Sequence, residues 1–170
     1  MAVRQHRFDA LARALVPGLF RYAWWLCRDR ALAEDLVQET LLRAWRSLDS
    51  LRDEAAARQW LITILRNEFV REISKRKDTV DIEALPLVDH NARVGAGDTD
   101  VEDVRRAIGK LTPEYREPII LQVLMGCSTE EIAELLELTQ AAVLTRLFRA
   151  RNQLRELLGG EGATFGEHFA

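Results

Sequence analysis

Acidic and amide side chains gather on one side of a predicted helix in the first half of the chain. In the segment AEDLVQETLLRAW, residues 33–45, apolar side chains recur at helical spacing. Asp35, Gln38 and Glu39 are spaced i, i+3 and i+4, which places them on one face of that helix. Carboxylates early in a helix are favoured by its dipole, so this face alone is typical of any amphipathic surface helix.

A second segment carries side chains suited to nucleic acid. In WLITILRNEFVREISKRK, residues 60–77, Asn67, Arg71 and Lys75 follow one another at four-residue spacing and share a face. A basic cluster at the C-terminal end of a helix also satisfies its dipole. That simpler explanation accounts for Lys75 better than for Asn67 and Arg71.

The strongest local pattern is a helix-turn-helix over residues 128–155. The second helix is expected to bury a stripe of apolar residues: Val143, Leu147, Ala150, Leu154 and Leu157. In this motif the second helix enters the major groove of DNA. The opposite face includes Gln140, Leu144, Thr145, Phe148 and Arg149. Phosphate neutralisation is expected from Arg146, Arg149, Arg151 and Arg155.

Leu144 and Phe148 are unusual on that outward face, where polar side chains would cost nothing. They could contact thymine methyl groups or occupy the groove of a protein partner. An ordinary helical hairpin with a solvated basic face is the alternative. Four arginines beside an exposed phenylalanine favour DNA.

The composition of the 170 residues excludes several classes of function. No run approaches the roughly 18 apolar residues of a membrane span, and no signal peptide is recognisable, so we expect a cytoplasmic location without membrane insertion. Cys27 and Cys127 are expected to be buried, reduced thiols. The histidines, His6, His90 and His168, lie in peripheral or linker positions. We therefore predict no metal site, no cofactor and no catalytic residue.

The distribution of charge indicates two all-α domains. Residues 1–77 have a net charge of +5, whereas residues 78–102 have a net charge of −6. We predict helical domains at 8–77 and 101–158, a flexible acidic linker at 78–100 and a disordered tail at 159–170. In the first domain, Pro17 is expected to end one short helix and begin another. Asp53 is expected to cap a helix of about residues 54–75.

Three segments, in this order, resemble the sigma-70 family of bacterial RNA polymerase initiation factors, specifically its extracytoplasmic-function (ECF, group IV) type. Residues 33–45 resemble region 2.2, residues 58–77 resemble regions 2.3–2.4, and residues 111–157 resemble region 4. The resemblance covers about residues 8–158. It implies a sigma region 2 bundle and a sigma region 4 helix-turn-helix, in a protein that is not an enzyme.

The resemblance also implies a role for each candidate residue. Asp35, Gln38 and Glu39 would bind the β′ clamp helices of core RNA polymerase, whose β subunit is a further expected partner. The family loop that captures a flipped −10 base aligns with Leu51, Arg52, Asp53, Glu54, Ala55 and Ala56. Promoter DNA near the same element would be approached by Asn67, Arg71 and Lys75. The −35 element would be faced by Gln140, Leu144, Thr145, Phe148 and Arg149, with Arg146 and Arg151 on phosphates.

The chain departs from the family pattern in and after the turn of the helix-turn-helix. Glu137 and Leu138 stand where the family often has glycine, and Ala141–Ala142 replace a frequent Gly-Thr pair. Leu144 stands where lysine or arginine is usual, which suggests a divergent −35 preference.

The leading hypothesis is therefore a stress- or envelope-responsive sigma factor controlled by an anti-sigma factor. A decoy that only sequesters an anti-sigma factor would not need the retained Arg71 and Arg149. A stand-alone helix-turn-helix repressor would need a dimerisation helix that we cannot find in the sequence. A metalloenzyme using Glu34, Asp35 and Glu39 would lack an accompanying histidine.

Overall fold

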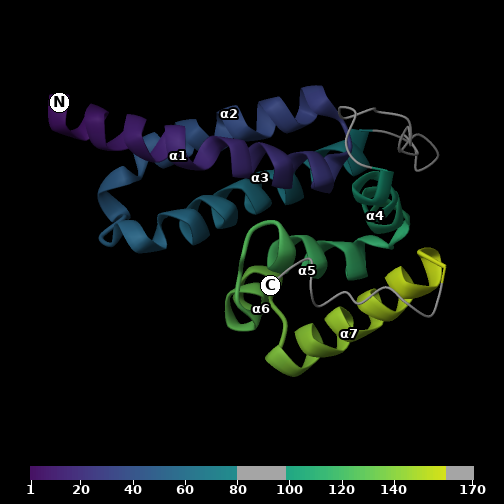
Figure 1. Ribbon diagram of the computed structural model, residues 1–170. Helices are drawn as coiled ribbons and strands as arrows, with labels where there is room; N and C mark the ends of the chain where they lie inside the picture. The colour runs from purple at the N-terminus through teal and green to yellow at the C-terminus, as the bar shows by residue number, and fades with distance from the viewer. Residues whose placement is uncertain (80–98, 160–170) are drawn as a thin grey trace. The chain divides into compact units, whose positions relative to one another are not determined.

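The computed structural model describes residues 1–79 and 99–159, which form two helical units (Figure 1). The first unit contains α1 (Ala2–Cys27), α2 (Arg30–Arg46) and α3 (Ala57–Thr79). The second contains α4 (Thr99–Lys110), α5 (Pro113–Val123), α6 (Thr129–Leu136) and α7 (Gln140–Leu157). Neither described range contains a strand, so the prediction of an all-α fold is confirmed.

Most of the predicted linker and nearly all of the predicted tail fall on residues 80–98 and 160–170, which lie outside the described residues. At both edges of the linker the helices are longer than predicted. The third helix continues through Thr79, and the fourth begins at Thr99.

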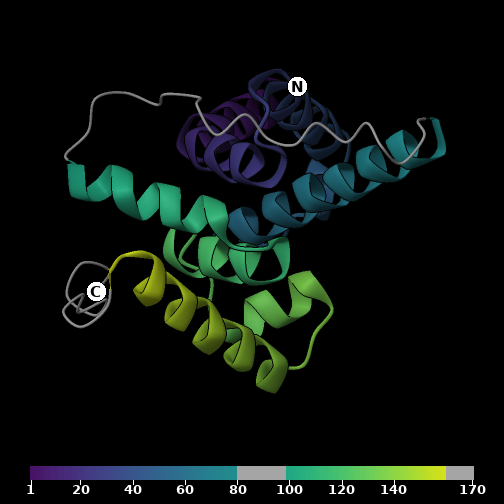
Figure 2. The ribbon, with the colours of Figure 1, turned by 90° about the vertical axis from the view of Figure 1, so that its right-hand side faces the viewer.

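The first unit is a bundle in which α1, α2 and α3 each pack against the other two (Figure 2). Its core includes Leu19 and Tyr22 of α1 and Ile62 and Leu65 of α3, all essentially inaccessible to solvent. The connection between α2 and α3 contains two short 3-10 turns, Leu48–Ser50 and Glu54–Ala56. Because Leu48 is fully buried, this connection is attached to the bundle and not free in solvent.

The break predicted at Pro17 is wrong, because α1 is one helix of 26 residues. A proline inside a helix removes the hydrogen bond to the carbonyl four residues earlier, here that of Arg13. Both residues are exposed, so water can bind the carbonyl, and the packing of Leu19 and Tyr22 keeps the helix in place. The helix also begins at Ala2, ahead of the predicted domain start at residue 8.

The second unit contains the predicted helix-turn-helix, formed by α6 and α7. Ser128 and Glu131 form a reciprocal capping box at the start of α6. Thr139 accepts a hydrogen bond of 3.1 Å from the Ala142 backbone N–H at the start of α7. The predicted stripe is buried at Val143, Leu147, Ala150 and Leu154.

The prediction is wrong for the last residue of that stripe, since Leu157 is 44% exposed. A heptad-like repeat drifts about 20° per seven residues around a straight α-helix. Leu157 lies fourteen residues after Val143 and has therefore turned away from the packed face.

Glu137, in the turn of this motif, has a left-handed backbone conformation with φ of 55°. This conformation costs an L-residue about 1 kcal/mol, and a carboxylate at a helix C-terminus also opposes the dipole. Glu137→Gly is therefore expected to raise the free energy of unfolding of the second unit by about 1 kcal/mol. Urea denaturation followed by circular dichroism would measure the change.

The matched control is Glu134→Gly, which removes the same side chain from an exposed position within α6. Glycine inside a helix lowers stability by about 1 kcal/mol, so the two variants should change the unfolding midpoint in opposite directions. Destabilisation by both would show that Glu137 is not strained.

Candidate nucleic-acid and protein interfaces

The acidic face of α2, formed by Asp35, Gln38 and Glu39, points away from the bundle because buried residues lie between Asp35 and Gln38 in the sequence. Leu36 and Val37 pack into the bundle, and Asp35 and Gln38 are exposed. Asp29 caps the helix by accepting a hydrogen bond of 3.1 Å from the Leu32 backbone N–H. The geometry therefore leaves a carboxylate and an amide free to meet a partner outside the bundle.

Glu39, the third member of that face, is half-buried and pairs with Arg43 of the same helix at 3.1 Å. Arg43 also pairs with Glu68 of α3. Glu68, 8% exposed, accepts a hydrogen bond of 2.9 Å from the Arg71 guanidinium. A network of four side chains of alternating charge thus connects the acidic face of α2 with the basic face of α3: Glu39, Arg43, Glu68 and Arg71.

This charge network was not predicted. The local signals for it are the four-residue spacing of Glu39 and Arg43 and the three-residue spacing of Glu68 and Arg71, both of which suit helical ion pairs. Its consequence is that the Arg71 guanidinium, although its side chain is 54% exposed, is oriented by a buried carboxylate.

The basic face of α3 is present as predicted from the spacing. Asn67, Arg71 and Lys75 are all exposed and recur every four residues along the helix. Because an α-helix rises about 1.5 Å per residue, the three positions extend over roughly 12 Å. That length suits contact with successive groups along a nucleic-acid backbone.

The loop that precedes α3 presents polar side chains on a buried support. Leu51 is only 5% exposed, so its side chain packs in the core and supports the loop from below. The exposed residues are Arg52, Asp53, Glu54, Ala55 and Ala56. Asp53 accepts a hydrogen bond of 2.9 Å from the Ala55 backbone N–H and so caps the 3-10 turn Glu54–Ala56, whereas α3 itself begins at Ala57, three residues later than predicted.

On α7, the face opposite the buried stripe is exposed at each predicted base-contacting position: Gln140, Leu144, Thr145, Phe148 and Arg149. The two apolar members are 55% and 63% exposed, at Leu144 and Phe148 respectively. Exposure of two large apolar side chains to water is unfavourable in the free protein, and contact with a partner would remove this apolar surface from water.

Two of the arginines predicted to bind phosphate are directed toward α5. Arg146 lies 3.6 Å from the carboxylate of Glu114, and Arg151 donates a hydrogen bond to the Gln122 side chain. Both arginines are half-buried, whereas Arg149 is exposed. Arg155 is exposed too, and it donates a hydrogen bond of 3.1 Å to the Asn152 side chain. Of Arg146, Arg149 and Arg151, Arg149 is therefore the one best placed to meet a phosphate.

The described residues contain no group of three metal-ligating side chains, and neither Cys27 nor Cys127 forms a disulfide bond. Cys127 is buried, whereas Cys27 is half-buried, and burial raises the pKa of the Cys27 thiol. No helix in residues 1–79 or 99–159 has the length and apolar character needed to cross a membrane.

Two family models match the chain in the order of the two units. Residues 11–79 match sigma-70 region 2, and residues 102–154 match sigma-70 region 4. The ECF RNA polymerase sigma factor EcfG of Rhodopseudomonas palustris is 36% identical over 88% of this chain and 84% of its own length. SigL of Mycobacterium tuberculosis, also an ECF sigma factor, is 36% identical over 91% of this chain and 93% of its own length.

Two solved structures are also similar to this chain. The sigma factor RpoE of Bartonella quintana, in complex with the anti-sigma factor NepR, superposes with a TM-score of 0.73 and 35% identity, covering 89% of this chain and 96% of that one. CnrH, in complex with the cytosolic domain of CnrY, has a TM-score of 0.63 and 28% identity, covering 91% of this chain and 88% of the CnrH chain.

Proposed function

The chain belongs to the ECF group of the sigma-70 family, and we propose that it directs core RNA polymerase to specific promoters through the surfaces described above. Members of this family are transcription initiation factors and not enzymes. The first unit would bind polymerase and the −10 element, and the second would bind the −35 element.

One observation carries the assignment of surfaces. The exposed acidic face at Asp35 and Gln38 shares a bundle with the exposed basic face at Asn67 and Lys75. Phosphate repels the first face and attracts the second. The acidic face, with Glu39, therefore suits the polymerase β′ clamp helices, and the basic face suits promoter DNA.

At the −35 element we assign Leu144 and Phe148 to thymine methyl groups in the major groove. Apolar side chains contact the thymine methyl, whereas the more usual lysine or arginine at position 144 would bind guanine or phosphate. Thr145 and Gln140 lie on the same exposed face and can supply hydrogen bonds to base edges.

Control by an anti-sigma factor is the second part of the proposal. Two structurally similar relatives were solved in complexes, RpoE with an anti-sigma factor and CnrH with CnrY. We propose that this chain works in the cytoplasm and that an anti-sigma factor sequesters it until a stress or envelope signal releases it.

Run-off transcription with purified core polymerase tests the main proposal. Addition of the full chain should produce promoter-dependent transcripts from a genomic template library. A decoy would bind an anti-sigma factor without producing any transcript. A helix-turn-helix repressor would bind duplex DNA without core polymerase, and either result would contradict the proposal.

The salt dependence of promoter binding should identify the phosphate contact on α7. Arg149→Ala is expected to reduce the slope of log affinity against log salt by roughly 0.9, the value for one lost phosphate contact. Arg151→Ala should reduce it less, because Arg151 is bonded to Gln122. Fluorescence anisotropy of the holoenzyme on promoter DNA, at several salt concentrations, measures both slopes.

The control is Arg105→Ala, which removes an exposed arginine from α4 and changes the net charge equally. Its slope should equal that of the wild type. An equal reduction for Arg105 and Arg149 would indicate a general charge effect and no specific contact.

A further inference from the structure

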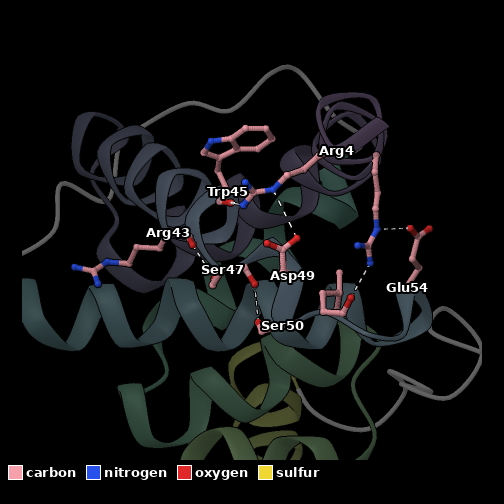
Figure 3. Close-up of polar contacts among 9 residues, drawn as sticks. Arg4, Arg43, Trp45, Ser47, Asp49, Ser50 and Glu54 are labelled. Carbon is pink, nitrogen blue, oxygen red and sulfur yellow. Dashed lines mark hydrogen bonds and ion pairs between the residues drawn. The ribbon is translucent and has the colours of Figure 1, made fainter. Parts of the chain in front are cut away.

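Arg4 and Arg7, near the start of α1, attach this helix to the connection between α2 and α3. Figure 3 shows Arg4 directed toward Trp45 and Asp49. Arg4 donates a hydrogen bond of 2.7 Å to the Trp45 backbone carbonyl, and its guanidinium lies 4.7 Å from the centre of the Trp45 ring. The same guanidinium lies 3.8 Å from the carboxylate of Asp49. Arg4 thus fixes the end of α2 and the first 3-10 turn.

Arg7 binds the next part of the connection through both sides of its guanidinium. One nitrogen donates to the Leu51 carbonyl at 2.7 Å, and another donates to the Glu54 carboxylate at 2.8 Å. The Arg7 side chain is 31% exposed. A planar guanidinium can satisfy two acceptors in one geometry, which a lysine ammonium cannot do in the same way.

These two contacts lie on either side of the exposed tip of the loop, Arg52 and Asp53. Inside the loop, order comes from short local bonds, such as those from Ser50 to the Ser47 carbonyl and from Ala55 to Asp53. Arg7 adds a long-range constraint, because its partners Leu51 and Glu54 lie 44 and 47 positions after it in the chain.

Neither arginine belongs to the matched part of region 2, which begins at residue 11. Both also precede the domain start at residue 8 that the sequence pattern indicates. Arg7 contacts the loop assigned to capture of a flipped base, and Arg4 contacts the end of α2 and the 3-10 turn just before that loop. Receiving an unstacked base requires the loop to be ordered, and prior ordering lowers the entropy lost on binding.

We propose that Arg7, supported by Arg4, is a positioning residue that holds residues 51–56 in the conformation that receives an unpaired −10 base. This proposal rests on the proposed sigma-factor function. Arg7 would act through the Leu51 carbonyl and the Glu54 carboxylate, without itself touching the base.

The test uses holoenzyme assembled from core polymerase and the full chain, with a promoter found by run-off transcription. The probe is a fluorescent single-stranded oligonucleotide carrying the non-template −10 sequence. Arg7→Gln is expected to weaken binding of this probe about tenfold, the effect of one charge-assisted hydrogen bond. Arg7→Lys, which can satisfy one acceptor at a time, should give an intermediate loss.

Affinity for core polymerase and for a −35 duplex should be unchanged in both variants. Core binding depends on α2, so its preservation shows that the first unit is folded. Arg13→Gln, an exposed change of the same charge on the same helix, is the matched control and should behave as the wild type.

Unchanged binding of the −10 probe by Arg7→Gln would overturn the positioning role. An equal loss on the −10 probe and the −35 duplex would also overturn it, since a positioning residue affects only its own loop. Failure of the proposed sigma-factor function can be distinguished from failure of the positioning role, because the wild-type chain itself would then yield no promoter-dependent transcript.

Discussion

Asp35→Lys is expected to weaken binding of the chain to core RNA polymerase about 100-fold, with both helical units still folded. Asp35 is exposed and forms no hydrogen bond or ion pair with another described residue, whereas Glu39 is paired with Arg43. The substitution removes an attractive charge and places a repulsive one against the proposed clamp-helix partner. Binding of labelled protein to core polymerase, measured by fluorescence anisotropy, gives the affinity.

Glu34→Lys is the matched control, because it makes the same change of charge at the preceding, exposed position of α2. It breaks a surface ion pair with Arg30, which is worth about 0.5 kcal/mol or less. A general electrostatic effect would act on both variants alike. Equal losses at Glu34 and Asp35 would therefore contradict a specific contact by Asp35, Gln38 and Glu39.

Simultaneous replacement of Leu144 and Phe148 by alanine is expected to weaken holoenzyme binding to the −35 element about 30-fold. Each side chain buries roughly one methyl-sized apolar contact against a thymine, worth about 1 kcal/mol, and two such contacts correspond to this factor. The measurement is anisotropy on a promoter duplex. Both side chains are solvent-exposed, so the second unit should remain folded.

Replacement of −35 thymines by deoxyuridine removes only the 5-methyl groups and provides the complementary test. The wild-type protein should lose affinity on the deoxyuridine promoter, whereas the double variant should bind both promoters equally. If the double variant binds the promoter normally but no longer binds an anti-sigma factor, the apolar pair serves a protein partner and the thymine assignment is wrong.

The local structure could be predicted because it depends on neighbours within a few residues. Asp53, for example, acts as a cap by binding the backbone N–H of Ala55, two positions away. The exposure of Asn67, Lys75 and Phe148 follows from helical spacing relative to buried residues. The prediction failed at Pro17 because a proline on an exposed face of a packed helix is tolerated, a fact that only packing reveals.

Whether a charged side chain is available to a partner could not be predicted in the same way. Arg151 is bonded to Gln122, and Arg43 to Glu68. Pairs so far apart in the chain have no spacing rule, since the fold alone brings them together. Leu51 illustrates the same limit for the loop, where a residue aligned with a base-contacting segment packs in the core.

The amino-acid sequence by itself determined the family, the helices and the faces that they expose, because helical periodicity and capping are local. The tertiary structure alone decided which charges on those faces are already paired within the protein. It also decided that Arg7, 44 residues before Leu51, holds the proposed −10 loop. Long-range contacts of this kind depend on how three helices pack, and packing is a property of the whole bundle.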